Sequence, residues 1–200
     1  MILKSILFLF LNCFNVADVS AQKKTYKDSL LNYQNKYVTN LKVVTNDERK
    51  FISFYPIDKK YHVVASFKRI IDTIGFDMNT SSGMIKKYFI YGRLNFRIKD
   101  SAVQLYVYQA EALMKQEKLK NYLFVPFGDA TSGSGSYGGG RYMEFFMKDI
   151  KKNKVILDFN KAYNPYCAYT TGYNCPIPPV ENRLQIAITA GEKDFSKPFH

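Results

Sequence analysis

The sequence predicts a mainly β fold, in which an antiparallel sheet curls into a sandwich or barrel. An amphipathic helix at the N-terminus and a long loop rich in Pro and Tyr near the C-terminus accompany the sheet. The main observation is that apolar and polar residues alternate in several short runs after Asn46, as they do in half-buried strands. Short turns separate most of these runs, which favours antiparallel neighbours.

The first element of the predicted domain has a helical period. Thr25 or Asp28 can cap its start, because a side-chain oxygen there accepts a hydrogen bond from the free backbone N–H groups of the first turn. The residues expected on the buried face recur at three- and four-residue spacings: Leu30, Gln34, Tyr37, Val38 and Leu41. We therefore expect one amphipathic helix over residues 25–41 that packs against the rest of the protein.

Three runs have a clear two-residue period, and each predicts a strand with one buried face. The alternating residues are Tyr61, Val63, Ala65 and Phe67 in the first run, Leu94, Phe96 and Ile98 in the second, and Val103, Leu105 and Val107 in the third. Lys99 and Asp100 separate the second run from the third, and this spacing predicts a tight hairpin turn.

The remaining elements are shorter. Residues 110–119 predict a short helix, and residues 123–127 predict a strand. A lysine-rich turn separates residues 142–148 from residues 155–159, so we expect these two runs to pair as a hairpin. A last alternating run, residues 184–189, predicts a final strand and brings the number of strands to about eight. The chain shows no internal repeat and no linker, so residues 22–200 are expected to form a single domain.

The N-terminus has the three parts of a secretory signal peptide. Residues 1–4 carry a charge, residues 6–11 are apolar, and residues 19–21 form a small-residue cleavage site. The apolar run is too short to span a bilayer as a retained helix. We therefore expect cleavage near Ala21 and export to the periplasm or the cell exterior.

Two alternatives to the cleaved signal stay open. The first is a buried N-terminal helix that remains part of the fold. The second is a lipid anchor at Cys13, which Asn12 disfavours because a lipoprotein signal has a small residue in that place.

The charge balance is strongly basic, with 29 Lys and Arg against 17 Asp and Glu and a net charge of +12. Loss of residues 1–21 leaves the balance unchanged, since it removes Lys4 and Asp18. A nucleic-acid interface would interleave the charge with stacking aromatic residues on one face, so we expect no nucleic-acid partner. Weak, nonspecific attraction to anionic lipid or polysaccharide fits better. No segment after the signal is apolar enough to cross a membrane.

Cys167 and Cys175 are the two cysteines that remain after signal cleavage. An even number in an oxidising compartment favours one disulfide, which would close a short loop. Free thiols and a shared metal ion are the alternatives. The metal is the poorest of the three, because His62 and His200 are the chain's only imidazoles and make an incomplete zinc set.

Six of the chain's 11 glycines lie in residues 128–141, GDATSGSGSYGGGR. A G-x-G-x-x-G pattern occurs within this loop, but a dinucleotide-binding loop leads from a strand into a helix, and this one leads into a strand. The companion motifs of kinases, P-loop proteins and G-x-S-x-G hydrolases are missing. Two interpretations remain, a loop whose glycines supply positive φ angles and a backbone cradle that lets a ligand approach closely.

Residues 158–184 combine two Cys, four Pro and several Asn and Asp, a composition typical of a long, internally bonded loop. Such loops are often functional. Together with Tyr137 and Tyr142 upstream, its tyrosines are either rigid binding surface or filler beneath the loop: Tyr163, Tyr166, Tyr169 and Tyr173.

Three carboxylates, Asp129, Asp158 and Glu192, lie at strand ends beside these loops. Paired carboxylates can share acid–base chemistry or hold a hard cation, whereas a single Asp beside Gly or Asn more often forms a turn. Arg141 and Arg183 border the two loops, where each could pair with a carboxylate or bind an anionic ligand group.

Several long blocks of the chain resemble one known family. They read FYPIDKKYHVVASF, LFVPFGDATSGSGSYGGGRYMEF and VILDFNKAYNPYCAYTTGYNCPIPPVENRLQIAITAGEK. These blocks closely resemble the family called domain of unknown function 1684, over roughly residues 50–193. Its members are bacterial and archaeal proteins, and no activity is established for them. The resemblance therefore implies a shared, β-rich fold but no activity.

These observations favour an exported, noncatalytic domain that binds a polar small molecule or glycan between the Gly-rich loop and the Tyr/Pro-rich loop. The alternatives are a hydrolase that uses Asp129 and Asp158 as paired carboxylates, and a structural or partner-binding envelope protein. We expect no cofactor and no metal; the oligomeric state stays open. The candidate binding residues are Asp129, Thr131, Tyr137, Arg141, Asp158, Asn160, Tyr163, Asn164, Asn182, Arg183 and Glu192.

Overall fold

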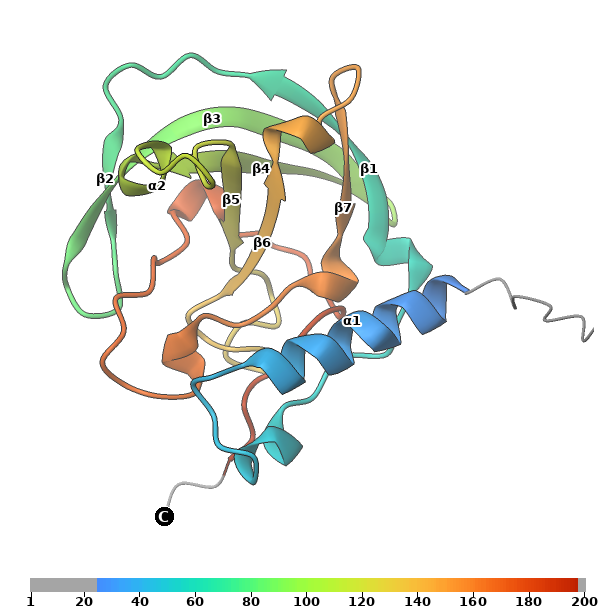
Figure 1. Cartoon of the computed structure of the whole chain (residues 1–200). Helices are drawn as coiled ribbons and strands as arrows, with labels where there is room; N and C mark the ends of the chain where they lie inside the picture. Colours follow the sequence, from blue (N-terminus) through green and yellow to red (C-terminus); the bar gives the residue numbers. More distant parts are fainter. Residues whose placement is uncertain (1–24, 198–200) are drawn as a thin grey trace, which may run out of the picture.

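The computed structural model describes residues 25–197 (Figure 1). The predicted signal peptide, residues 1–21, lies outside the described residues. Within residues 25–197, no helix combines the length and apolar character that a membrane span requires.

The described chain forms one antiparallel sheet of seven strands. The strands are β1 (His62–Arg69), β2 (Phe76–Asn79), β3 (Ile85–Ile98), β4 (Ser101–Ala110), β5 (Tyr122–Phe127), β6 (Arg141–Phe146) and β7 (Lys154–Asp158). Six of them run in the order β6-β5-β4-β3-β1-β7, while β2 pairs with β3 beside this path. The sheet curls into a half-barrel whose end strands, β6 and β7, leave one side unclosed (Figure 1). The predicted mainly β architecture is confirmed.

The predicted N-terminal helix is also confirmed. Helix α1 (Tyr26–Asn40) lies across one end of the half-barrel (Figure 1). Thr25 and Asp28 form a capping box, in which each side chain accepts a hydrogen bond from the backbone N–H of the other residue, at 3.0 and 3.1 Å. Leu30 and Gln34 lie on the buried face, as the helical period predicts.

Short helical turns fill the connections. They are η1 (Glu48–Phe51), η2 (Lys59–Tyr61), α2 (Glu111–Met114), η3 (Met147–Asp149), η4 (Phe159–Lys161), η5 (Tyr166–Ala168) and η6 (Val180–Asn182). The helix predicted over residues 110–119 is therefore shorter than expected, since α2 ends after four residues and turns follow.

The two faces of the sheet carry different side chains. The inner face holds a large, mainly aliphatic core, to which all strands except β2 contribute. The outer face of the central strands holds a smaller aromatic cluster, which the Tyr- and Pro-rich residues near 163 help to cover. Its buried members are Met78, Tyr88, Tyr108, Ala110, Phe124 and Tyr142.

A β-bulge lets β3 serve both clusters. Ile90 pairs with Tyr108, but Gly92 pairs with Val107, so Tyr91 has no opposite residue. One extra residue exchanges the faces of a strand, because successive side chains point to opposite sides. Even-numbered residues before the bulge consequently face the outer cluster, whereas those after it face the inner core.

The tight hairpin turn between β3 and β4 is confirmed, since Ile98 pairs with Ser101 and Lys99 has a φ angle of 52°. The hairpin predicted for residues 142–148 and 155–159 is wrong. β6 pairs with β5, and β7 pairs with β1, so the lysine-rich turn connects the two ends of the sheet. Alternation locates a strand, but the curl of the whole sheet decides its partner.

The final strand predicted at residues 184–189 is wrong as well. Arg183 forms an isolated bridge with Gly128, and residues 184–189 form no strand. Ile186 and Ile188 nevertheless pack against the inner core, so the alternation correctly indicated which side chains are buried. The backbone of this segment is hydrogen-bonded in a different way.

Candidate functional site

Two segments with unusual composition meet in the structure. We call residues 128–140 the glycine loop and residues 162–183 the tyrosine–proline segment. The N–H of Gly128 donates to the carbonyl of Asn182 at 3.0 Å, and the hydroxyl of Tyr137 donates to the carbonyl of Cys167 at 3.4 Å. The two segments are therefore joined by direct hydrogen bonds.

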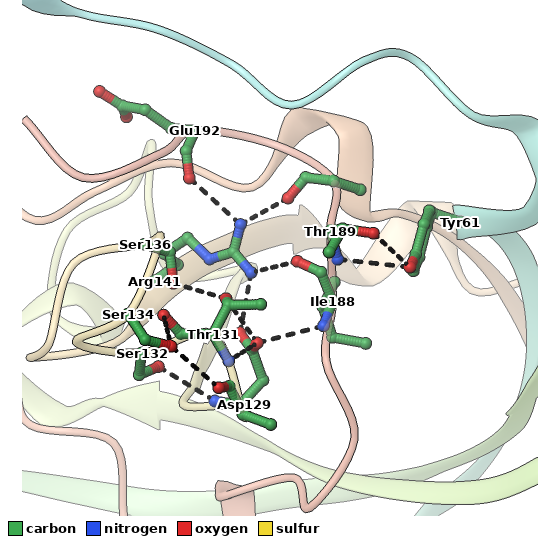
Figure 2. Close-up of polar contacts among 12 residues, drawn as sticks. Tyr61, Asp129, Thr131, Ser132, Ser134, Ser136, Arg141, Ile188, Thr189 and Glu192 are labelled. Carbon is green, nitrogen blue, oxygen red and sulfur yellow. Dashed lines mark hydrogen bonds and ion pairs between the residues drawn. The ribbon is translucent and has the colours of Figure 1, made fainter.

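At this contact, Arg141 and Asp129 form an ion pair (Figure 2). Arg141 Nη2 lies 2.8 Å from Asp129 Oδ2, and both side chains have 0% exposure. The guanidinium also donates to the carbonyl oxygens of Ile188, Ala190 and Glu192. Asp129 Oδ1 accepts a hydrogen bond from the N–H of Ile188 at 3.1 Å. The pair thus binds residues 188–192 through their backbone, which explains why they need no partner strand.

The interior of the glycine loop is bonded to the same carboxylate. Thr131 donates to Asp129 Oδ1 from both its N–H, at 2.8 Å, and its hydroxyl, at 2.7 Å. The hydroxyls of Thr131 and Ser136 lie 2.8 Å apart, and both residues are buried (Figure 2). The side chains of Asp129, Thr131 and Ser136 therefore contact protein rather than solvent, whereas Ser134 is exposed.

Glu192 forms a second buried polar cluster. Its carboxylate accepts hydrogen bonds from the hydroxyl of Tyr37 at 3.0 Å, from the hydroxyl of Tyr169, and from the N–H of Asn164 at 2.9 Å. Burial raises the pKa of Glu192 to about 7. The cluster connects helix α1, the tyrosine–proline segment and the C-terminal residues.

Asp158 and Asn160 belong to a third cluster, at the start of α1. The hydroxyl of Tyr26 lies 3.1 Å from both carboxylate oxygens of Asp158. Asn160 Nδ2 donates to Asp158 Oδ1 at 3.0 Å and to the carbonyl of Asp58 at 2.9 Å. Asp158 therefore anchors the helix, and it lies in a different cluster from Asp129.

The remaining predicted residues have separate surroundings. Asn182 has 0% exposure and donates to the carbonyls of Tyr106 and Pro126, at 2.9 and 2.7 Å. Tyr163 donates from its hydroxyl to Glu144 at 2.6 Å. Arg183 is exposed, and its guanidinium has no ion pair within the described chain. The structure therefore distributes the eleven candidates over several places.

The open space next to the tyrosine–proline segment is a cavity of about 500 Å³ on the outer face of the sheet, which we call the tyrosine pocket. Strands β3 to β6 supply one wall, and residues 163–166 and 172–176 supply the other. The tyrosines that line it are Tyr88, Tyr122, Tyr142, Tyr163, Tyr166 and Tyr173. No residue of the glycine loop belongs to this lining.

Tyr88 provides a polar group in this pocket that the protein leaves unused. Its side chain is 6% exposed, and burial raises its pKa to about 12, so the phenol is neutral. Within residues 25–197, its hydroxyl has no hydrogen-bond partner. Tyr142, in contrast, donates to the carbonyl of Pro176. The hydroxyl of Tyr88 is therefore available to a ligand.

The two cysteines shape the wall of the pocket. The sulfurs of Cys167 and Cys175 lie at disulfide distance, with their Cα atoms 6.3 Å apart, in agreement with the disulfide that the sequence favours. Ser81 ties this loop to the β2–β3 turn, since its hydroxyl donates to the carbonyl of Tyr173 and accepts from the N–H of Cys175, both at 3.1 Å.

Sequence reasoning missed Tyr88, Tyr122 and Phe124 as pocket residues. A signal for Tyr122 and Phe124 exists in residues 122–127, YLFVPF, which are apolar on both faces of the strand. A strand with two apolar faces is covered on both sides. The aromatic residues on one face therefore indicated a second packed layer.

A family model described as "Protein of unknown function (DUF1684)" matches residues 47–193. The chain belongs to this family. A solution NMR structure of an uncharacterized protein from Haloarcula marismortui is similar to this DUF1684 chain, with 30% identity and a TM-score of 0.62. The match covers 84% of this chain and 94% of the archaeal one. No curated protein matches the chain.

Proposed function

We propose that this DUF1684 protein is an exported, noncatalytic domain that binds a polar small molecule or glycan in the tyrosine pocket. The observation that carries the proposal is a cavity of about 500 Å³ lined by six tyrosines, among them Tyr88, whose ring is buried and whose hydroxyl has no partner within residues 25–197. Ligand pockets combine apolar, aromatic walls with a few placed polar groups. A sugar ring offers both a C–H face for the rings and hydroxyls for Tyr88.

The proposed binding site differs from the one expected from the sequence, which lay between the glycine loop and the tyrosine–proline segment. The glycine loop is joined to the tyrosine–proline segment by hydrogen bonds, and its Asp129, Thr131 and Ser136 side chains are buried. The cavity lies on the sheet-facing side of the tyrosine–proline segment. In this proposal the glycine loop supports the segment from behind, and the ligand contacts its tyrosines.

Export is supported by the signal-like N-terminal sequence and by the cysteine pair at disulfide distance. Disulfides persist in oxidising compartments. Residues 22–200 would then be the mature single domain.

The hydrolase alternative receives less support. Asp129 has 0% side-chain exposure and is paired with Arg141, so it cannot reach a substrate without loss of that pair. Asp158 is bonded to Tyr26 and Asn160 in another cluster. The structural or partner-binding alternative is favoured by the two buried polar clusters and by the half-buried one at Asp158, and the experiment below separates it from the binding proposal.

The test is a thermal-shift screen of mono- and oligosaccharides and polar metabolites, because a ligand that binds the native state raises Tm. We expect at least one compound that raises the Tm of the unchanged protein and raises the Tm of Tyr88→Phe by less, since this substitution removes only the hydroxyl. Tyr91→Phe is the matched control, since its hydroxyl also lacks a partner in the described chain but lies outside the pocket. If no compound raises Tm, or if both variants respond equally, the proposal is wrong.

A further inference from the structure

A second cavity lies beyond the tyrosine pocket, and we call it the isoleucine cavity. Its volume is about 860 Å³. The tyrosine–proline segment passes between the two spaces, where Thr80 forms a bridge with Pro176 and the N–H of Ile177 donates to Asn79 at 2.9 Å. Residues up to Pro176 line the tyrosine pocket, and residues from Ile177 onward line the isoleucine cavity.

The walls of the isoleucine cavity are mainly aliphatic. Its large aliphatic residues come from the loop after β1, from β2 and β3, and from the tyrosine–proline segment: Ile70, Ile71, Met78, Ile90, Ile177 and Val180. Ile71 is 83% exposed and Val180 is 75% exposed. Large apolar side chains gathered at an open cavity mark an interaction site for an apolar partner.

Tyr108 adds a polar group on a buried ring. It is 2% exposed and lines the cavity, and its ring packs edge-on against Phe76 at 5.5 Å. Burial, together with the nearby charge of Glu181, raises its pKa, so the phenol is neutral. Among residues 25–197, the hydroxyl of Tyr108 has no hydrogen-bond partner. A bound molecule with a polar group could use it.

Charges of both signs stand at the mouth. Glu181 and Arg183 are exposed, line the cavity, and form no ion pair within the described chain. Asn182, which lies between them, is fixed by hydrogen bonds to the backbone of Tyr106 and Pro126. The two opposite charges are therefore held on a rigid turn.

Two other carboxylates line this cavity. Asp72 accepts hydrogen bonds from the N–H groups of Ile74, Gly75 and Ile90, so its carboxylate already binds the protein backbone. Asp77 is exposed on β2 and adds a second negative charge beside Glu181. A purely anionic head group would meet Arg183 but also these acids, whereas a zwitterion complements both signs.

We propose that the isoleucine cavity binds a single-chain zwitterionic amphiphile, whose alkyl chain lies against the isoleucines and whose anionic and cationic groups pair with Arg183 and Glu181. Aliphatic walls supply the energy through buried methylene groups, and the two charges select the head group. The cavity and the buried ring of Tyr108 favour one molecule bound within the cavity over contact with a bilayer surface.

The experiment is isothermal titration calorimetry of the full mature chain with lysophosphatidylethanolamines of increasing acyl length. Each lipid is used below its critical micelle concentration. We expect one-to-one binding that tightens about fourfold per added methylene until the cavity is filled. Arg183→Gln should weaken binding about tenfold. Glu181→Gln should shift the preference toward the anionic lysophosphatidylglycerol.

Val180→Trp tests the proposed binding position directly. Val180 is exposed and lines the isoleucine cavity, so a larger side chain there should fill the cavity opening without disturbing the core. Val64→Trp is the matched control, since Val64 is 60% exposed on β1 and lies outside the cavity lining. Val180→Trp should abolish binding and Val64→Trp should leave it unchanged. Equal binding in both variants, no binding of any chain length, or binding to phosphatidylethanolamine vesicles without binding of the monomer would overturn the proposal.

Discussion

Arg141 Nη2 lies 2.8 Å from Asp129 Oδ2, with neither side chain accessible to solvent. The pair hydrogen-bonds the backbone of residues 188–192, in place of a partner strand. The most conspicuous charged residues of the glycine loop region therefore hold the C-terminal residues on the sheet. Their burial gives them a structural role that can be measured.

Arg141→Met should destabilise the protein by about 3–5 kcal/mol, because it leaves the carboxylate of Asp129 buried without its cation. The free energy of unfolding from urea titration measures this loss. Arg183→Gln is the control, since this arginine is exposed and unpaired in the described chain, and it should change stability by less than about 0.5 kcal/mol. Equal losses in the two variants would contradict a special role for the buried pair.

Glu192 should make stability depend on pH. Its pKa is raised from 4.5 to about 7 by burial, so between these values the native state holds a proton that the unfolded state has released. The free energy of unfolding should therefore fall by about 3 kcal/mol as pH rises through this window. Above pH 7 this contribution should be constant, because both states are ionised.

Glu192→Gln should remove this part of the pH dependence, since an amide does not titrate. Urea titrations of both proteins from pH 4.5 to pH 8 measure the difference, and other titrating groups are common to the two chains. Parallel stability curves for the two proteins would show that Glu192 keeps an ordinary pKa.

The cysteine pair should stabilise the wall of the tyrosine pocket. Reduction opens the loop that Cys167 and Cys175 close, and in the chain-entropy model this lowers the free energy of unfolding by about 2.5 kcal/mol. Unfolding with and without reductant measures the loss. The double variant Cys167→Ala, Cys175→Ala should be insensitive to reductant. Free alkylation of both thiols in the folded protein would rule the bridge out.

Gly140→Ala should lower the free energy of unfolding more than Gly83→Ala does, although both glycines have a positive φ angle. Gly140 has a φ of +85°, and an added Cβ would lie 2.6 Å from the carbonyl oxygen of Phe127 and 2.7 Å from Pro178 Cγ. We expect a loss of about 3 kcal/mol from strain and overlap together.

Gly83→Ala separates these two causes. Gly83 has a φ of +80° and no heavy atom within 4 Å of an added Cβ, so only the backbone strain of about 1 kcal/mol should remain. Thermal unfolding of both variants provides the comparison. Similar Tm values would mean that the contact with Phe127 relaxes without cost.

Local patterns predicted much of this fold. The spacing of Leu30 and Gln34 and the capping residues Thr25 and Asp28 predicted α1, since these signals act within one or two turns of chain. Alternation predicted β1, β4 and the hairpin at Lys99, because a strand's buried face is set by its own residues. The partners of β6 and β7 were mispredicted, since pairing depends on the curl of the complete sheet.

By itself, the sequence determined the family, the β-rich class and the N-terminal helix. Only the tertiary structure decided that Asp129 and Arg141 are buried against residues 188–192, and that the open space lies among tyrosines from three different strands and a distant segment. The reason is physical. Residue type and spacing are local properties, whereas burial and cavity shape arise from contacts between residues far apart in the chain.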